Sequence, residues 1–252
     1  SRNLNPAAHF SRNFYDPITA LLADFGAEKV FVEGDAVILA VIERPDEPLA
    51  VARACGLAQR LLEVVERKNA ECQRLDLPLL ELGIGIAYSN EQPTYLYDGG
   101  HKIMISPAIN RADRLSSCDA RLRGLLQAEG VQKGVEVVQA VSSRSSEADG
   151  KLRPVRFNVN GIEMEPAAFF QLANGMKLHK LYVPGDSGLF YVGRYPDQRG
   201  NAQWLAVREA PIRTLLDQQL LETTEDGDRR FFHVVTDSPL LEKLHKRLSG
   251  KR

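Results

Sequence analysis

The sequence predicts an α/β domain followed by a smaller, strand-rich α+β domain, and three observations lead to this division. Up to about residue 141, helix-periodic apolar segments alternate with short apolar runs. The serine-rich segment 142–150 contains no apolar residue except one alanine, as linkers do. Beyond it, the chain consists mainly of short β-like runs. We therefore expect domains at 1–141 and 154–252, joined by a linker at 142–153.

Composition limits the classes of partner. The chain has 252 residues, 44% of them hydrophobic and 26% charged, which suits a globular protein with room for two cores. The net charge of -1 gives no chain-wide basic field, so we expect neither nucleic acid nor an anionic membrane as partner. Cys55, Cys72 and Cys118 form neither a disulfide framework nor a close metal-binding spacing. No membrane-length apolar run or secretion signal is present, which indicates a cytoplasmic location.

The first half of the chain reads as two helices around a hairpin. Apolar residues three or four apart predict a helix over residues 14–25, and Gly26 ends it. Residues 29–41 form two apolar segments around Gly34 and Asp35, as a hairpin does. A long helix is predicted over residues 49–70, with an apolar stripe that packs on the hairpin.

The next elements are a strand over residues 79–88, a loop that includes Gly99 and Gly100, and a short strand over residues 102–105. Gly83 and Gly85 within the first of these strands indicate close approach of another backbone. A helix follows over residues 108–128, with Pro107 suited to its first turn, and then a strand over 135–141.

The second half is expected to form a small barrel or an open sheet. Arg194 and Arg208 recur near Tyr195 and Trp204, which is typical of an anion-binding or nucleotide-binding surface but also of a solvated face. The predicted strands cover 155–159, 180–183, 189–195, 203–207 and 230–235, and the predicted helices cover 166–172 and 239–248.

Three polar residues of the first half are candidates for chemistry. Asp35 follows a glycine at a hairpin corner, where a carboxylate is a plausible metal ligand or simply a turn residue. Asn110 and Arg114 are four residues apart on a predicted helix, so they share a face and can reach one ligand. The structural alternatives are that Asn110 caps its helix and that Arg114 pairs with Asp113 or a nearby glutamate.

Segments 31–40, 82–86 and 109–115, in this order and spacing, resemble the catalytic domain of the class III nucleotide cyclases. The resemblance covers roughly residues 10–140 and implies a ferredoxin-like βαββαβ-type fold. It also implies that Asp35 binds Mg or Mn, that Asn110 and Arg114 stabilise the transition state, and that Phe31 and Ile103 stand at the nucleotide-binding positions that read the base. The implied ligand is a nucleoside triphosphate, and the implied assembly is a homodimer with sites at its interface.

Such a site suits cyclisation chemistry. A ribose oxygen attacks the α-phosphorus and pyrophosphate leaves, so charge builds up on phosphate oxygens. Two carboxylate-held divalent ions activate the attacking oxygen, while an arginine neutralises the developing charge.

This sequence departs from the family pattern at several positions. No strand that carries an aspartate precedes Asp35, although the family has a metal ligand there. Phe31 and Ile103 cannot hydrogen-bond a base edge, and Ser106 and Pro107 replace a glycine.

The sequence therefore favours a catalytically degenerate module that dimerises or senses nucleotide within a larger signalling protein. One alternative is an active nucleotidyl cyclase whose first metal-binding aspartate lies upstream of Ser1. A third hypothesis places the function in the arginine-rich second domain, which would bind a phosphorylated ligand.

Overall fold

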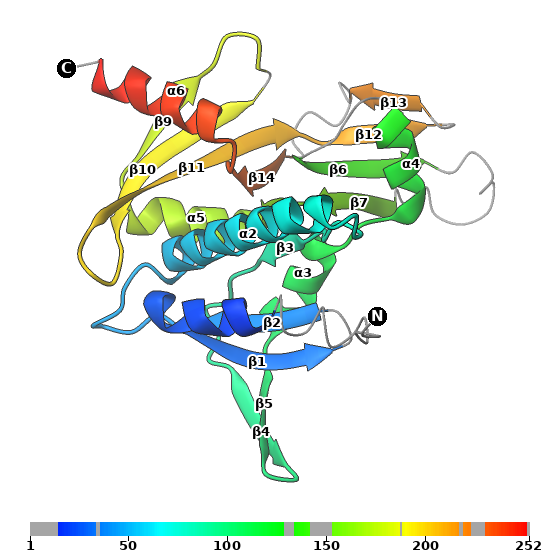
Figure 1. The fold of residues 1–252 in the computed structure, drawn as a ribbon. Helices are drawn as coiled ribbons and strands as arrows, with labels where there is room; N and C mark the ends of the chain where they lie inside the picture. Colours follow the sequence, from blue (N-terminus) through cyan, green and yellow to red (C-terminus); the bar gives the residue numbers. More distant parts are fainter. Residues whose placement is uncertain are drawn as a thin grey trace.

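A computed structural model describes residues 15–33, 36–128, 134–141, 153–186, 188–216, 219–222 and 230–250. The fold is mixed α/β, as predicted, and its largest sheet has six strands in the order β3-β8-β14-β11-β10-β9. In the described residues this sheet is open, so the predicted alternative of a closed barrel is not seen. Figure 1 shows the long helix α2 lying across the body, with the hairpin β1–β2 on one side of it and the large sheet on the other.

Apart from the helix predicted over residues 108–128, the predicted helices begin and end close to the predicted positions. A helix over residues 15–22 runs into the short 3-10 helix η1, and Gly26 ends it with a left-handed φ of 58°. The other helices are α2 (Ala50–Arg74), α3 (Pro107–Ser116), α4 (Ala120–Ala128), α5 (Pro166–Gly175) and α6 (Ser238–Ser249), and η1 covers Ala23–Phe25.

Four sheets contain the described strands. Besides the six-stranded sheet, there is a four-stranded sheet in the order β13-β12-β6-β7 and two hairpins, β1–β2 and β4–β5. The strands are β1 (Ala27–Glu33), β2 (Ala36–Val41), β3 (Gly83–Ile86), β4 (Thr94–Asp98), β5 (His101–Ile105), β6 (Gly134–Val141), β7 (Arg153–Val159), β8 (Gly161–Met164), β9 (Leu178–Tyr182), β10 (Leu189–Pro196), β11 (Ala202–Pro211), β12 (Arg213–Leu216), β13 (Gln219–Glu222) and β14 (Arg230–Val234).

Helix α2 packs in two directions. One side contacts α5 and the six-stranded sheet through Ala52, Cys55 and Ala58. The adjacent side contacts the first helix and the β1–β2 hairpin through Leu57, Leu61 and Val65. The predicted apolar stripe therefore does pack on the hairpin, but it also forms the floor of the main core. One helix thus sets the position of both sheets.

Pairing within the large sheet crosses the predicted linker. Strand β3 lies parallel to β8, with Gly83 opposite Gly161 and Ile86 opposite Met164. The main core likewise combines Val51 and Ile86 with Phe232. Residues 142–150 lie outside the described part of the chain, and β6 and β7 on either side of 142–152 pair with each other. The division into two domains remains a prediction, and its two parts share a sheet and a core.

Two predicted elements need correction. The loop before residue 101 contains a strand, β4, which pairs with β5. The helix predicted over residues 108–128 is two helices, because Cys118 forms an isolated bridge to Phe157 and the Asp119 N–H donates to the Arg156 carbonyl at 2.8 Å. These long-range backbone bonds to β7 interrupt the helix in a way that helical periodicity does not reveal. The short strands β8, β12 and β13 were also absent from the predicted set.

The close backbone approach expected at Gly83 and Gly85 is confirmed. A Cβ atom at Gly85 would lie 2.0 Å from the carbonyl oxygen of Ala112, and one at Gly83 would lie 2.4 Å from that of Ser116. We expect Gly85→Ala to lower the free energy of unfolding by about 2–3 kcal/mol, because the backbone of α3 at Ala112 has to move. Urea unfolding measures this loss, with Gly124→Ala as a control because a Cβ there meets nothing within 4 Å.

Candidate functional site

Helix α3 presents the predicted catalytic pair on its exposed face. The Ser106 hydroxyl caps the helix by accepting from the Ala108 N–H at 3.3 Å, and Pro107 occupies the first turn. Leu115 is buried against β3, whereas Asn110 and Arg114 are both exposed. Within the described residues, neither the Asn110 nor the Arg114 side chain has a hydrogen-bond or ion-pair partner. Both remain available to a ligand or to another chain.

Arg111, between them, has a structural role that the sequence analysis missed. Its Nε lies 2.8 Å from Glu165 Oε2, and its Nη2 donates to the Tyr88 carbonyl at 2.7 Å. Glu165 also accepts from the Tyr88 N–H at 2.6 Å, so three elements meet at one carboxylate. Its spacing in the sequence could have predicted this role. Arg111 lies four residues before Leu115, so the two side chains share one face of the helix, and Leu115 is buried. This network orients α3 and fixes where Asn110 and Arg114 point.

The hairpin that carries the predicted metal ligand is present. Strands β1 and β2 pair antiparallel, with Phe31 opposite Ile38 and a bulge between Lys29 and Phe31. Asp35 itself lies outside the described residues. Within the described residues, no three His, Cys, Asp or Glu side chains lie together as metal ligands. Binding of Mg or Mn by Asp35 therefore stays a prediction.

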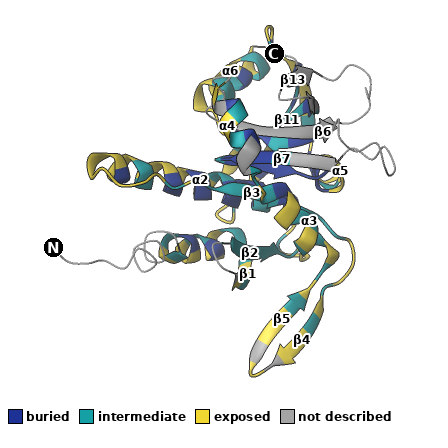
Figure 2. Ribbon diagram, turned by 90° about the vertical axis from the view of Figure 1, so that its right-hand side faces the viewer, coloured by how far each residue is buried: buried dark blue, intermediate teal, exposed yellow. Residues whose placement is uncertain are grey.

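Ile103 lies on the β4–β5 hairpin, which projects from the body (Figures 1 and 2). Leu96 is opposite Ile103 and Thr94 is opposite Ile105, so these side chains share one face of the hairpin. Leu96 is 52% exposed, Ile103 40% and Ile105 48%, which is unusual for three neighbouring large apolar residues. Phe31, by contrast, is half-buried. Ile103, one of the two predicted base-reading residues, thus lies on the exposed apolar face of the β4–β5 hairpin.

The two arginines predicted to bind anions do not lie together. The Arg194 guanidinium stacks over the Trp204 ring at 4.2 Å, and Arg208 forms an ion pair with Asp186 at 2.7 Å. Arg208 lies opposite Phe190 on the adjacent strand, four residues from Arg194, or about 13 Å along the sheet. Anion binding by these two residues remains a prediction, and Arg208 would first have to leave Asp186.

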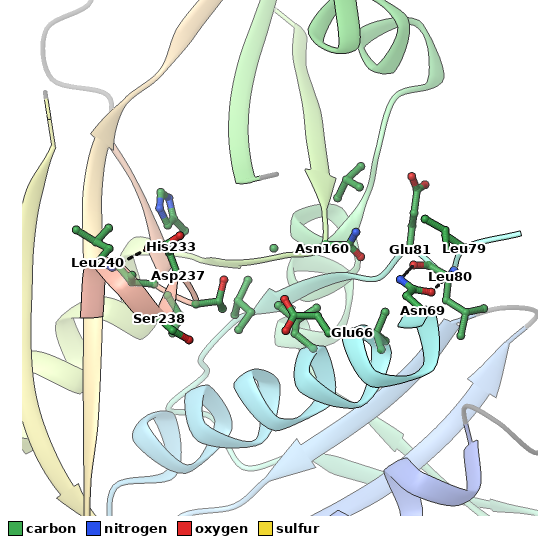
Figure 3. A pocket seen from close by; sticks show the side chains of 18 of the residues that line it. Glu66, Asn69, Leu79, Leu80, Glu81, Asn160, His233, Asp237, Ser238 and Leu240 are labelled. Atoms are coloured by element: carbon green, nitrogen blue, oxygen red, sulfur yellow. Dashed lines mark hydrogen bonds between the residues drawn. The ribbon is translucent and has the colours of Figure 1, made fainter. Parts of the chain in front are cut away.

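Arg208 lines a cavity of about 1110 Å³ between α2, β8 and the start of α6. Figure 3 shows polar side chains around it, several of which already have partners. Asn69 exchanges two hydrogen bonds with the Leu80 backbone, and Asp237 accepts from the Leu240 N–H at 2.7 Å. Both lining arginines, Arg123 and Arg208, pair with carboxylates. Glu66 and Asp237 also line the cavity and have no ion-pair partner among the described residues, so the cavity wall carries a net negative charge.

His233 borders this cavity opposite Arg208 on the paired strand. Burial, reinforced by the charge of Arg208, lowers the pKa of His233 to about 4. Its imidazole is therefore neutral near pH 7 and adds no positive charge to the cavity wall.

Comparison with known proteins found no matching family model and no matching curated protein. The guanylyl cyclase Cya2 is a solved structure with a similar fold, 11% identical, at a TM-score of 0.43 over 74% of this chain and 79% of that chain. The guanylate cyclase domain of RhGC from Catenaria anguillulae, in complex with GTP, is also 11% identical, at a TM-score of 0.42 over 93% of this chain and 87% of that chain. With TM-scores below 0.5, these likenesses assign neither a family nor a role to any residue.

No helix among the described residues is long and apolar enough to cross a membrane.

Proposed function

We propose that this chain is a regulatory signalling module that resembles a class III nucleotide cyclase domain, forms a homodimer and binds a nucleoside triphosphate at a site shared by two copies. The observation that carries the proposal is the exposed pair Asn110 and Arg114, held on one face of α3 without partners among the described residues. An arginine and an amide that point the same way suit a phosphate and a ribose hydroxyl. Arg111 in the same helix shows the contrast, because it is fully engaged.

The projecting β4–β5 hairpin supports the dimer. Its apolar face, Leu96, Ile103 and Ile105, leads directly into α3. A second copy that covers this face would remove apolar area from water and would come close to Asn110 and Arg114. Hence the surface that binds the second copy and the surface that binds the nucleotide adjoin.

Weak or absent turnover is the second part of the proposal. Phe31 and Ile103 offer no hydrogen bond to a base. The active alternative requires a further carboxylate beside Asp35. We expect nucleotide binding without rapid formation of a cyclic product.

Nucleotide binding tests the ligand. We expect a fluorescent GTP or ATP analogue to bind the purified chain, and we expect Arg114→Ala to weaken binding at least tenfold because one charge-assisted contact is worth about 1.5–3 kcal/mol. Equilibrium fluorescence titration measures the dissociation constant. Arg67→Ala is a matched control, since Arg67 is an exposed arginine on α2. Equal affinity of the Arg114→Ala variant and the unaltered chain would contradict the proposed site.

An activity assay on the same purified chain distinguishes a regulatory module from an active nucleotidyl cyclase. Incubation with ATP, GTP, CTP or UTP and Mg²⁺ or Mn²⁺ is expected to give little cyclic monophosphate. Rapid turnover that Asp35→Ala abolishes would instead establish the active alternative.

A further inference from the structure

A cavity of about 680 Å³ lies between α2, η1, the turn that joins β10 to β11 and the start of α6. Neither Asn110 nor Arg114 is among its described lining residues, so it is separate from the proposed nucleotide site. Part of its wall is apolar and includes Leu21, Phe25, Leu62 and Leu241.

The wall also contains a buried tyrosine hydroxyl without a partner. Tyr195 on β10 is 3% exposed, and within the described residues its hydroxyl makes no hydrogen bond. A Cβ atom at Gly56 would lie 2.0 Å from Tyr195 Oη and 2.9 Å from Phe25 Cε1, so the hydroxyl lies next to two other residues that line the cavity. Tyrosine hydroxyls usually find a hydrogen-bond partner when they are buried. A molecule in the cavity can supply the partner that Tyr195 lacks.

The unpartnered groups of this wall include two donors. Burial raises the pKa of Tyr195 to about 12, so its hydroxyl keeps its proton near pH 7 and can donate it to a hydrogen bond. Trp204 lines the same cavity, and its indole N–H, which can only donate, also has no hydrogen-bond partner in the described part of the chain. An occupant therefore needs an acceptor, such as a carbonyl oxygen.

The charges around the cavity disfavour an anion. Four carboxylates and two guanidinium groups line it and give a formal charge of -2, from Asp24, Glu63, Glu66, Asp197, Arg60 and Arg199. Arg60 is already paired with Glu63 at 2.6 Å. A phosphate or a carboxylate would meet net repulsion here, whereas an uncharged molecule would not.

We infer that this cavity binds an uncharged, mainly apolar small molecule whose carbonyl oxygen accepts a hydrogen bond from the Tyr195 hydroxyl. Its apolar part would cover Phe25 and the leucines of the wall and remove them from water. Its carbonyl would satisfy a buried donor that the fold leaves unpaired. The inference does not depend on nucleotide binding.

The naphthyl ketone prodan tests the cavity, because it is uncharged, carries one carbonyl and changes its emission when that carbonyl accepts a hydrogen bond. We expect saturable binding, measured by quenching of Trp204, the only tryptophan of the chain. Tyr195→Phe removes the hydroxyl alone and should weaken binding about fivefold, the factor that one neutral hydrogen bond is worth. The emission of prodan bound to this variant should lie at shorter wavelength than that of prodan bound to the unaltered chain.

Tyr191→Phe is the matched control, because Tyr191 lies on the same strand, its hydroxyl bonds Glu209, and it does not line the cavity. It should bind prodan as tightly as the unaltered chain does, and circular dichroism checks that both variants are folded. The anion 5-dimethylaminonaphthalene-1-sulfonate, of similar size, should bind more weakly than prodan.

Three results would each overturn the inference. Prodan may fail to saturate the unaltered chain, Tyr195→Phe may bind it as tightly as the unaltered chain or lose no more affinity than Tyr191→Phe, or the sulfonate may bind as tightly as the ketone.

Discussion

Replacement of Arg53 by alanine is expected to lower the free energy of unfolding by about 3–5 kcal/mol. Arg53 is 5% exposed and lies at the start of α2. Its guanidinium donates to four backbone carbonyls, at 2.8 Å to Phe25, 2.9 Å to Ile42, 2.6 Å to Glu47 and 3.1 Å to Pro48. Burial lowers the pKa of Arg53 while the charge of Glu47 opposes that effect.

These carbonyls belong to the segments on both sides of the hairpin, so one side chain ties η1, the end of β2 and the loop before α2 together. Alanine would leave the carbonyls without donors, and lysine cannot reproduce the planar fork. Urea unfolding at constant pH measures the loss. Arg60→Ala, on the same helix and paired with Glu63 at the surface, should cost less than about 1 kcal/mol. A loss at Arg53 as small as that at Arg60 would show that the four contacts contribute little.

Glu163 is expected to make the stability of the protein depend on pH. It is 2% exposed on β8, and burial raises the pKa of its carboxyl from 4.5 to about 7, against the opposing charge of Arg156 on β7. The folded state therefore holds this proton more tightly than the unfolded state. Stability falls as pH rises from 4.5 to 7, by about 3 kcal/mol in total from this group.

His233, the cross-strand neighbour of Glu163, acts in the opposite direction. Its pKa is lowered from 6.5 to about 4, so its contribution to stability is lost as pH falls through that range. The difference between the unaltered chain and Glu163→Gln isolates the carboxyl. We expect Glu163→Gln to gain stability relative to the unaltered chain as pH rises from 5 to 8, in urea unfolding series at each pH. A difference that does not vary with pH would contradict the raised pKa, and Glu63→Gln at an exposed position serves as control.

Local patterns predicted much of the fold. The positions of α2, the β1–β2 hairpin, α5 and α6 follow from apolar periodicity, from Gly26 and from prolines at first turns. The glycines of β3 correctly predicted a close backbone neighbour. The pairing of strands was harder to predict from the sequence. Strand β3 pairs with β8, more than 70 residues further along the chain, and the hydrogen bonds of such pairing leave no local sequence pattern.

The candidate site was also only partly predictable from the sequence. Spacing placed Asn110 and Arg114 on one helix face, and the structure agrees that both are exposed. The ion pair of Arg111 with Glu165, and that of Arg208 with Asp186, depend on partners that only the tertiary fold brings near. The sequence therefore could not tell which arginines form ion pairs within the fold and which are exposed without a partner.

Whether two copies share the nucleotide site is tested most directly by the nucleotide affinity of a hairpin variant. Leu96→Asp combined with Ile105→Asp places charge on the exposed apolar face and leaves the predicted base-reading position Ile103 unchanged, and analytical ultracentrifugation should find this variant monomeric. Its affinity for the fluorescent nucleotide, measured at the same chain concentration, should be at least tenfold weaker than that of the unaltered chain, although Arg114 and Asn110 are intact. A monomeric variant that binds the nucleotide as tightly as the unaltered chain would contradict a site shared between two copies.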